Sequence, residues 1–177
     1  MAKRAGERLG AVVFDLDACV WFPEMYMLWG GGAPFSPAGS NTLKDSSGQK
    51  VSLLGVSAQV WGDLKSKPEF EGVKLCIASR CDEPEWADEC LSLFTTSNGT
   101  TLAECVDVKQ IHKGSKQTHL TEIAEETGVP FQEMLFFDDD PTNIRDVSKL
   151  GVTSILTPHG VTAEKWAEGL QHFGLMP

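Results

Sequence analysis

Two aspartates, Asp15 and Asp17, stand at the end of a short apolar run near the start of the chain. The run, Ala11-Val-Val-Phe14, is typical of a buried parallel strand. Ligands of open α/β sheets bind beyond the carboxyl ends of such strands. Two carboxylates in so small a space repel each other, so the pair needs a cation or a shared proton. The spacing therefore indicates metal-assisted chemistry, with a turn or helix-capping pair as the plain structural alternative.

Polar side chains also follow three later apolar runs, and in a parallel sheet all of them lie along one edge. In chain order they are Ser79, Arg80, Lys116, Asp138, Asp139 and Asn143. Magnesium binds oxygen ligands, usually one or two carboxylates with waters and a substrate phosphate. Lysine, serine and backbone N–H groups suit the phosphate itself, and a carboxylate beside the metal can attack phosphorus. The set predicts phosphoryl transfer, which needs positioning and charge neutralisation.

Taken singly, these residues have ordinary explanations. Ser79 fits a strand-end hydroxyl that bonds to the backbone, and Lys116 fits a solvated helix residue. Arg80 fits a surface partner of Asp82 or Glu83. Only the ordered combination favours the chemical interpretation.

The elements that must position these residues alternate between apolar and amphipathic stretches. The expected strands are residues 11–15, 73–79, 104–108, 134–138 and 152–156. The expected helices begin near Pro84, Ser115, Asp140 and Thr162, which are residue types favoured at a helix cap or first turn. Such alternation predicts an α/β fold, a parallel sheet with helices on both faces and right-handed crossovers.

Residues 21–50 are an exception, because they are too long for an ordinary connection between a strand and a helix. They contain three consecutive glycines, three prolines, a turn signal at Asp45-Ser-Ser-Gly48 and several aromatic residues. The segment directly follows Asp17, so we expect a flap or β-hairpin that borders the site. Its aromatic content argues against a disordered insertion.

Length, charge and cysteine content limit the function classes. A chain of 177 residues suits one domain, with the flap as an insertion. The net charge of −10 argues against nucleic-acid binding, although not against small phosphorylated substrates. Five cysteines without a Cys-x-x-Cys pair predict neither a disulfide framework nor a zinc site. Without an apolar signal core or a membrane-length run, we expect a cytoplasmic protein with no membrane partner.

Four ordered motifs resemble those of the haloacid dehalogenase (HAD) superfamily, and more narrowly the eukaryotic magnesium-dependent phosphatases. They are Val-Phe-Asp-Leu-Asp-x-x-x-Trp at residues 13–21, Ala78-Ser-Arg80, Gly114-Ser-Lys116 and Phe136-Phe-Asp-Asp139. The segment Asn143 to Thr153 continues the likeness, which runs from about Leu9 to Phe173 and is weakest between Phe22 and Gly72. The resemblance implies a Rossmann-like, HAD-like parallel sheet of about five strands, with a small flap and no large cap domain.

The resemblance also implies an activity and a cofactor. The activity is that of a hydrolase, a Mg²⁺-dependent phosphomonoesterase that works through an aspartyl-phosphate. The substrates are phosphotyrosine, including phosphotyrosyl proteins, or small sugar-phosphate-like compounds. In this comparison Asp15 matches the nucleophile and Asp17 the acid/base. Asp139 matches a metal ligand, together with Asp15 and the backbone carbonyl of Asp17.

The remaining positions match phosphate-binding and accessory roles. Ser79 and Lys116 match the phosphate-binding residues, and Arg80 matches a neighbouring substrate contact. Asp138 is expected to orient Lys116 or a water on the metal. Asn143 is either a first-turn residue or an accessory hydrogen-bonding residue.

Cys19 departs from the family pattern, which has a threonine at this position that helps to shape the phosphate pocket. A thiol is a weaker donor, so the resemblance places Cys19 at the phosphate site with altered efficiency. Two rival functions follow from the same residues. One is a phospho-receiver module, although receivers carry the acidic pair on the first strand and the phosphorylated aspartate on a middle strand, and have no flap. The other is an inactive relative that only binds phosphorylated partners.

Overall fold

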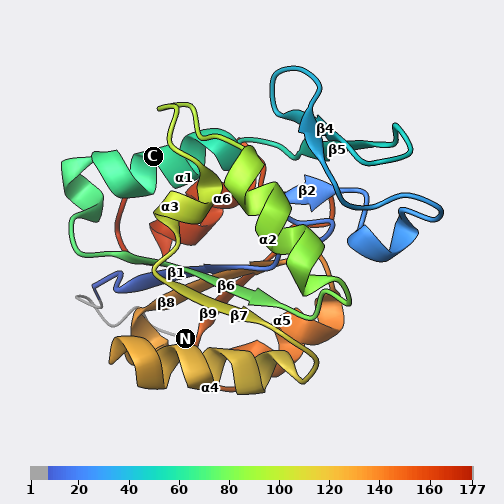
Figure 1. The fold of residues 1–177 in the computed structure, drawn as a ribbon. Helices are drawn as coiled ribbons and strands as arrows, with labels where there is room; N and C mark the ends of the chain where they lie inside the picture. The colour runs from blue at the N-terminus through green and yellow to red at the C-terminus, as the bar shows by residue number, and fades with distance from the viewer. Residues whose placement is uncertain (1–7, 177) are drawn as a thin grey trace.

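A five-stranded parallel sheet forms the centre of the computed structural model, which describes residues 8–176 (Figure 1). The strand order is β7-β6-β1-β8-β9. The strands are β1 (Ala11–Phe14), β6 (Lys74–Ser79), β7 (Val108–Ile111), β8 (Met134–Asp138) and β9 (Thr153–Leu156). Because β1 lies between β6 and β8, the three strands that carry the predicted acidic and hydroxyl residues are neighbours.

Helices cover both faces of this sheet (Figure 1). On one face lie α4 (Lys116–Thr127) and α5 (Pro141–Ser148); on the other lie α1 (Ser57–Ser66), α2 (Pro84–Leu93), α3 (Leu102–Cys105) and α6 (Ala163–Gln171). Alternate residues of β1 enter opposite cores, so Ala11 and Val13 pack with α4 and α5 while Val12 and Phe14 pack with the other helices. Both faces of the central strands are therefore apolar, and only the strand ends can carry charge.

A second, smaller sheet is antiparallel and lies beside the main one, at the upper right of Figure 1. Its order is β2-β5-β4-β3, with strands β2 (Trp21–Phe22), β3 (Ser36–Pro37), β4 (Thr42–Lys44) and β5 (Lys50–Leu53). We call residues 21–53 the flap. It ends at Leu53, slightly later than the sequence predicted, and it contains the short 3₁₀ helix η1 (Met25–Met27).

Hydrogen bonds within the flap and contacts with α2 hold the flap in place. The buried Asp45 accepts N–H hydrogen bonds from Gly32 at 2.9 Å and from Gln49 at 2.8 Å. A Cβ at Gly32 would come within 2.1 Å of the Trp86 ring, so this close approach to α2 requires glycine. The backbone N–H of Phe35 donates to Glu89 of α2 at 2.6 Å, which ties the other arm of the flap to the same helix.

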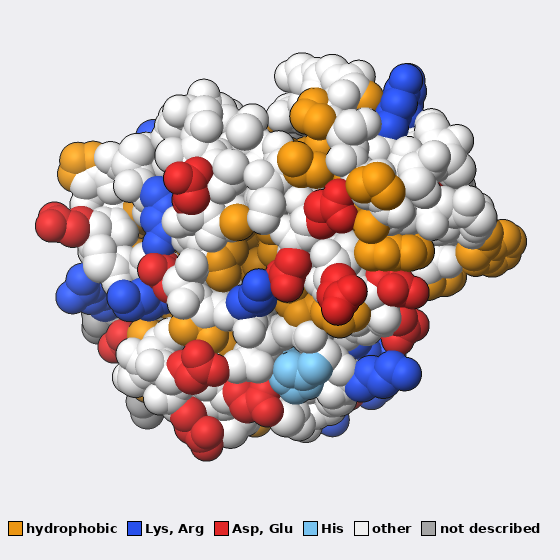
Figure 2. Space-filling view, viewed as in Figure 1, with side chains coloured by type: hydrophobic (Ala, Val, Ile, Leu, Met, Phe, Trp, Pro, Cys, Tyr) orange, Lys and Arg blue, Asp and Glu red, His pale blue; other side chains and the backbone are white. Residues whose placement is uncertain are grey.

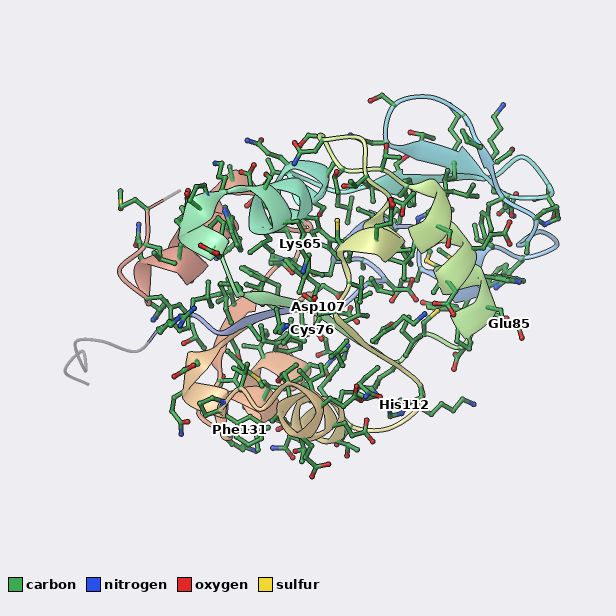
Figure 3. The ribbon with its side chains drawn as sticks, turned by 60° about the vertical axis from the view of Figure 1, so that its left-hand side comes forward. Lys65, Cys76, Glu85, Asp107, His112 and Phe131 are labelled. Atoms are coloured by element: carbon green, nitrogen blue, oxygen red, sulfur yellow. The ribbon has the colours of Figure 1, made fainter. Side chains whose placement is uncertain are left out.

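The predicted strand at residues 104–108 is wrong. Thr101 and Glu104 form a reciprocal capping box that starts α3, and β7 begins only at Val108. Asp107 lies between the two elements, where it accepts from the Leu75 N–H at 2.8 Å and pairs with Lys65 of α1 (Figure 3). Helix α1 was not predicted either.

The other predicted strands and helix starts agree with the structure to within a residue or so. Strand β8 has the predicted bounds, and β1, β6 and β9 differ by a residue at one end. The side chains of Ser115, Asp140 and Thr162 accept the N-cap hydrogen bonds of α4, α5 and α6. The ends of the predicted domain, residues 1–7 and 177, lie outside the described residues. No described helix is both long and apolar enough to cross a membrane.

The connection between β7 and α4 is fastened by His119. This buried side chain donates from Nε2 to the backbone carbonyl of His112 at 2.9 Å, and the two rings meet edge to face at 4.3 Å. Figure 3 shows His112 on this loop, which leads into α4 and Lys116. Burial, together with the charges of His112 and Lys116, lowers the pKa of His119 to about 4. The neutral ring is therefore the form that fits the fold.

We predict that His119 makes stability fall on acidification. Since its pKa is lower in the folded chain than in the unfolded one, its contribution is complete above the unfolded value and is lost as the pH falls toward the folded value. Between about pH 7 and pH 5 the wild type should lose about 2 kcal/mol more unfolding free energy than His119→Gln, which keeps an N–H donor. Chemical denaturation at each pH measures this difference. Parallel stability curves for the two proteins would contradict the prediction.

Candidate active site

A pocket of about 240 Å³ opens at the carboxyl ends of β1, β6 and β8. Eight of the nine predicted site residues have a place in or beside it, and the ninth, Cys19, does not line it. The lining residues are Asp15, Asp17, Glu24, Tyr26, Ser79, Arg80, Cys81, Asp82, Lys116, Asp139, Asp140 and Asn143. Asp138 lies directly behind them, bonded to Asn143 and Lys116.

Lys116 is the link between the strands. It is the first residue of α4, after the Ser115 cap, and its side chain is only 3% exposed. Its Nζ lies 2.6 Å from Oδ1 of Asp15 and 3.3 Å from Oδ2 of Asp138, and it also donates to the Ala78 carbonyl. Burial alone would lower the pKa of Lys116, but the charges of Asp15 and Asp138 outweigh it and raise the pKa. The lysine is thus a permanent cation among acidic groups.

Three carboxyl groups lie close together here, and Lys116 contacts two of them, Asp15 and Asp138. Asp15, Asp138 and Asp139 each place a carboxylate oxygen within 4.8 Å of the others. Burial raises the pKa of Asp15 well above its usual value, against the opposing charge of Lys116. Burial and the charge of Asp138 raise the pKa of Asp139 to about 6. One lysine cannot neutralise three carboxylates, so the cluster favours an additional cation.

This donor set fits Mg²⁺, which prefers carboxylate oxygens and keeps waters for the rest of its shell. Asp15 and Asp139 are among the predicted ligands, and the structure adds Asp138 to the same cluster. The carboxylate of Asp17 is not part of it. The expectation that Asp17 contributes through its backbone carbonyl stays a prediction.

Asp138 has a second set of contacts that fix its orientation. Its Oδ1 accepts from the Asp140 N–H at 2.8 Å, and its Oδ2 accepts from Nδ2 of Asn143 at 3.1 Å. Asp140 in turn caps α5 by accepting from the Thr142 N–H at 2.7 Å. The start of α5 thereby holds Asp138 next to Lys116, and the predicted role of Asp138 in orienting Lys116 or a water on the metal stays a prediction.

Asp17 has an environment of its own, made largely by the flap. Its Oδ1 accepts from Nε1 of Trp21 at 2.7 Å. Burial raises the pKa of Asp17, and the hydrogen bond from Trp21 is the largest of the effects that oppose that rise. Trp21 is itself fully buried and stacks on Phe94, with ring centroids 6.0 Å apart. A buried aromatic residue thus fixes the position of this carboxyl.

Ser79 and Arg80 leave β6 at the opposite wall of the pocket. The buried Ser79 hydroxyl accepts from the Cys81 N–H at 3.1 Å, and Arg80 is exposed at the rim. Sequence reasoning missed Cys81 and the flap residues Glu24 and Tyr26 at this pocket. It gave Trp21 a place in the first motif but no contact with Asp17. The spacing of four residues from Asp17 to Trp21 was the available signal, but only the turn with its left-handed Ala18 brings the two side chains together.

The expected contribution of Cys19 to phosphate binding needs correction. Its thiol is fully buried, 3.4 Å from Oγ1 of Thr157 and 3.6 Å from the carbonyl of Phe137. Burial, reinforced by the charge of Asp15, raises the pKa of this thiol well above its usual value. The side chain therefore packs beneath the site as a neutral group, because the chain turns inward after Ala18.

Comparison with known proteins agrees with this geometry. Residues 9–175 match the family model described as Acid Phosphatase. Human magnesium-dependent phosphatase 1 is 37% identical over 161 residues, which cover 91% of this chain and 85% of that protein. An HAD-like hydrolase superfamily protein of Schizosaccharomyces pombe is 33% identical, over 80% of this chain and 81% of its own.

Solved structures show the same fold at lower identity. Rhodobacter sphaeroides CbbY, solved with phosphate, superposes with a TM-score of 0.59 at 15% identity and covers 95% of this chain and all of that one. The N-terminal part of Bacteroides fragilis BF1531, solved with Mg, gives 0.63 at 19% identity over 97% of this chain, which spans 42% of that chain. A predicted HAD-like hydrolase of Porphyromonas gingivalis gives 0.58 at 15%, over 96% and 99% of the two chains.

We predict that Lys116→Met destabilises the metal-free protein strongly, because it leaves buried carboxylates without a cation. The unfolding free energy at neutral pH should fall by about 3–5 kcal/mol. Added Mg²⁺ should then raise the thermal midpoint of the variant more than that of the wild type. Thermal melts with EDTA and with Mg²⁺ measure both effects.

Lys165→Met is the matched control, since Lys165 pairs with Glu168 at the surface. An exposed pair contributes at most about 1 kcal/mol. Equal losses of unfolding free energy in the two lysine variants would show that the buried ion pairs of Lys116 stabilise the fold no more than a surface pair does.

Proposed function

Because the chain belongs to the acid phosphatase family of the haloacid dehalogenase superfamily, we propose that it hydrolyses phosphomonoesters with Mg²⁺ through an aspartyl-phosphate on Asp15. One observation carries the proposal. Lys116 holds Asp15 at the base of the pocket, while Asp17, two residues on, is held separately by Trp21. A pair of acids in two different environments can divide the roles of nucleophile and proton carrier.

Asp15 and Asp139, with the backbone carbonyl of Asp17, would hold the Mg²⁺ ion, and Asp138 belongs to the same acidic cluster. When bound, the ion neutralises charge on the phosphoryl oxygens. The hydroxyl of Ser79 and the ammonium of Lys116 line the same pocket and would bind those oxygens. Arg80 at the rim would contact phosphate or the adjoining part of the substrate.

In the first step an Asp15 carboxylate oxygen attacks phosphorus, and the bond from phosphorus to the leaving oxygen breaks. Asp17, whose pKa is raised by burial, delivers its proton to that leaving oxygen. Lys116 stays charged throughout, because its acidic neighbours raise its pKa, and it offsets the negative charge that develops next to Asp15.

In the second step the deprotonated Asp17 takes a proton from water, whose oxygen attacks the phosphorus of the aspartyl-phosphate. The bond between phosphorus and the Asp15 oxygen breaks, which releases inorganic phosphate and returns the Asp15 carboxylate. Asp17 ends the cycle protonated, as it began. The hydrogen bond from Trp21 keeps the Asp17 carboxyl in one position for both proton transfers.

We propose phosphotyrosine, free or in proteins, as the first substrate class to test, and sugar-phosphate-like compounds as the second. Tyr26 lines the mouth of the pocket and offers an aromatic wall to a phenyl ester. A phospho-acceptor module or a phosphate-binding module without turnover is the alternative function. Sustained turnover distinguishes the enzyme from both.

We expect Asp15→Asn to lose activity against p-nitrophenyl phosphate by about a thousandfold or more, because the amide is a poor nucleophile. EDTA should abolish wild-type turnover and Mg²⁺ should restore it. Asp140→Asn is the control, since it removes one charge from the same pocket but still caps α5. An Asp15→Asn enzyme that retained turnover, or a wild type without turnover on either p-nitrophenyl phosphate or phosphotyrosine, would refute the mechanism.

Trp21→Phe should mainly impair protonation of the leaving group. It keeps the stacking on Phe94 but removes the N–H that holds Asp17. We expect kcat/KM for phenyl phosphate, which reports formation of the aspartyl-phosphate, to fall about tenfold, because this leaving group needs a proton. The fall for p-nitrophenyl phosphate should be much smaller, since that leaving group departs without help.

Trp61→Phe is the matched control for Trp21→Phe. Trp61 is equally buried and packs on Phe14, but its Nε1 has no hydrogen-bond partner among the described residues. Its replacement should change both rates alike. A Trp21→Phe enzyme without dependence on the leaving group would show that Trp21 serves packing only.

A further inference from the structure

Large apolar side chains gather on the outer surface of the flap. Phe22, Tyr26, Met27 and Trp29 are 49%, 55%, 39% and 81% exposed. We call these four residues the flap patch. Among the described residues only one other large hydrophobic side chain, Met176, is comparably exposed. Isolated exposed apolar residues are common, but several of them gathered on one short segment indicate an interaction surface.

The flap patch is held outward by the residues between its members. Met25 and Leu28 are buried in the main core, and Trp21 is anchored to Asp17. The same short segment thus buries some side chains and exposes others, and the buried ones prevent the exposed ones from packing onto the protein. Figure 2 shows hydrophobic side chains on the right of the molecule, where Figure 1 places the flap, with acidic side chains next to them.

The flap patch is continuous with the catalytic pocket. Tyr26 belongs to the patch and also lines the pocket, and Glu24 from the same segment lies beside it. The pocket, at about 240 Å³, is below the size range of sites that enclose a whole drug-sized ligand. It has room for a phosphoryl group and the near part of a leaving group. The remainder of a larger substrate must lie across the mouth, where the patch begins.

The charges at the mouth narrow the choice of substrate. Glu24, Asp82 and Asp140 line the pocket beyond the catalytic aspartates, and the whole chain carries a net charge of −10. Of the cations that line the pocket, Lys116 lies beside Asp15 and would serve the phosphoryl group, which leaves Arg80 for the rest of the substrate. Acidic groups next to the phosphate would meet repulsion here, and basic groups would meet attraction.

We propose that the flap patch docks a protein substrate, a segment in which apolar residues adjoin the phosphotyrosine and basic residues lie close by. This inference rests on the proposed function and adds to it the chemistry of the flanking residues. A small sugar phosphate fills the pocket but leaves the patch uncovered. A peptide with apolar and basic neighbours covers the patch and complements the acidic mouth, so the observations favour the peptide.

The test compares three substrates of the wild-type enzyme: p-nitrophenyl phosphate, a phosphotyrosyl peptide with leucine and lysine neighbours, and the same peptide with serine and glutamate in their place. We expect kcat/KM to be at least about tenfold higher for the apolar, basic peptide than for the acidic one. Trp29→Ala should lower kcat/KM for the apolar, basic peptide about tenfold and leave p-nitrophenyl phosphate turnover unchanged. Met176→Ala, at an exposed site outside the flap, should change neither.

Peptide-binding measurements on an inactive variant distinguish docking of the peptide from the rate of hydrolysis. Fluorescence anisotropy with labelled peptides on Asp15→Asn should show the same preference, weakened when Trp29→Ala is added. Equal affinity for the two peptides, or no effect of Trp29→Ala, would overturn the docking proposal while p-nitrophenyl phosphate turnover still supported the phosphatase. With a sugar phosphate assayed as a fourth substrate, a higher kcat/KM for it than for the apolar, basic peptide would also overturn the docking proposal. Absence of all turnover would instead remove the proposed function, and the docking proposal with it.

Discussion

The buried contact of Lys116 with Asp15 and Asp138 is the interaction on which the rest of the site depends. Three strands and a helix meet there, and their polar groups would be mutually destabilising without it, because carboxylates removed from water need an opposite charge. The lysine can reach both carboxylates because the Ser115 cap places it at the very start of α4. With Asp139 added, the cluster has more carboxylates than Lys116 can neutralise. The remaining negative charge and the oxygen ligands suit a hard cation such as Mg²⁺.

The second constraint is the turn between β1 and the flap. Asp15 directly follows β1 and accepts a hydrogen bond from Lys116. Asp17 lies two residues further on and accepts a hydrogen bond from Trp21. That division gives two neighbouring carboxyls different partners, which is the physical basis for giving them different roles. The flap is therefore part of the pocket: its inner side supplies the hydrogen bond to Asp17, and its outer side carries exposed apolar side chains.

Much of the fold could be predicted because its signals are local. Apolar runs marked β1, β6, β8 and β9, and cap residues marked the starts of α4, α5 and α6. The error at residues 104–108 also has a local cause. The capping box of Thr101 and Glu104 starts a helix there, although the apolar pattern suggested a strand. Helix α1 was missed because its buried face, with Val60 and Trp61, is recognisable only against the sheet that it covers.

For the site, the sequence by itself determined which residues could do the chemistry and, through a parallel sheet, that their side chains meet at one edge. Residue type and order along the chain were enough to predict that Asp15, Ser79, Lys116 and Asp139 line one pocket, because the carboxyl ends of parallel strands lie at the same edge of the sheet. The tertiary structure decided what order cannot encode: which side chains face the pocket and which face the core. It turned Cys19 inward to Thr157 and brought Trp21 to Asp17, because side-chain direction after a strand depends on the turn and on the packing around it.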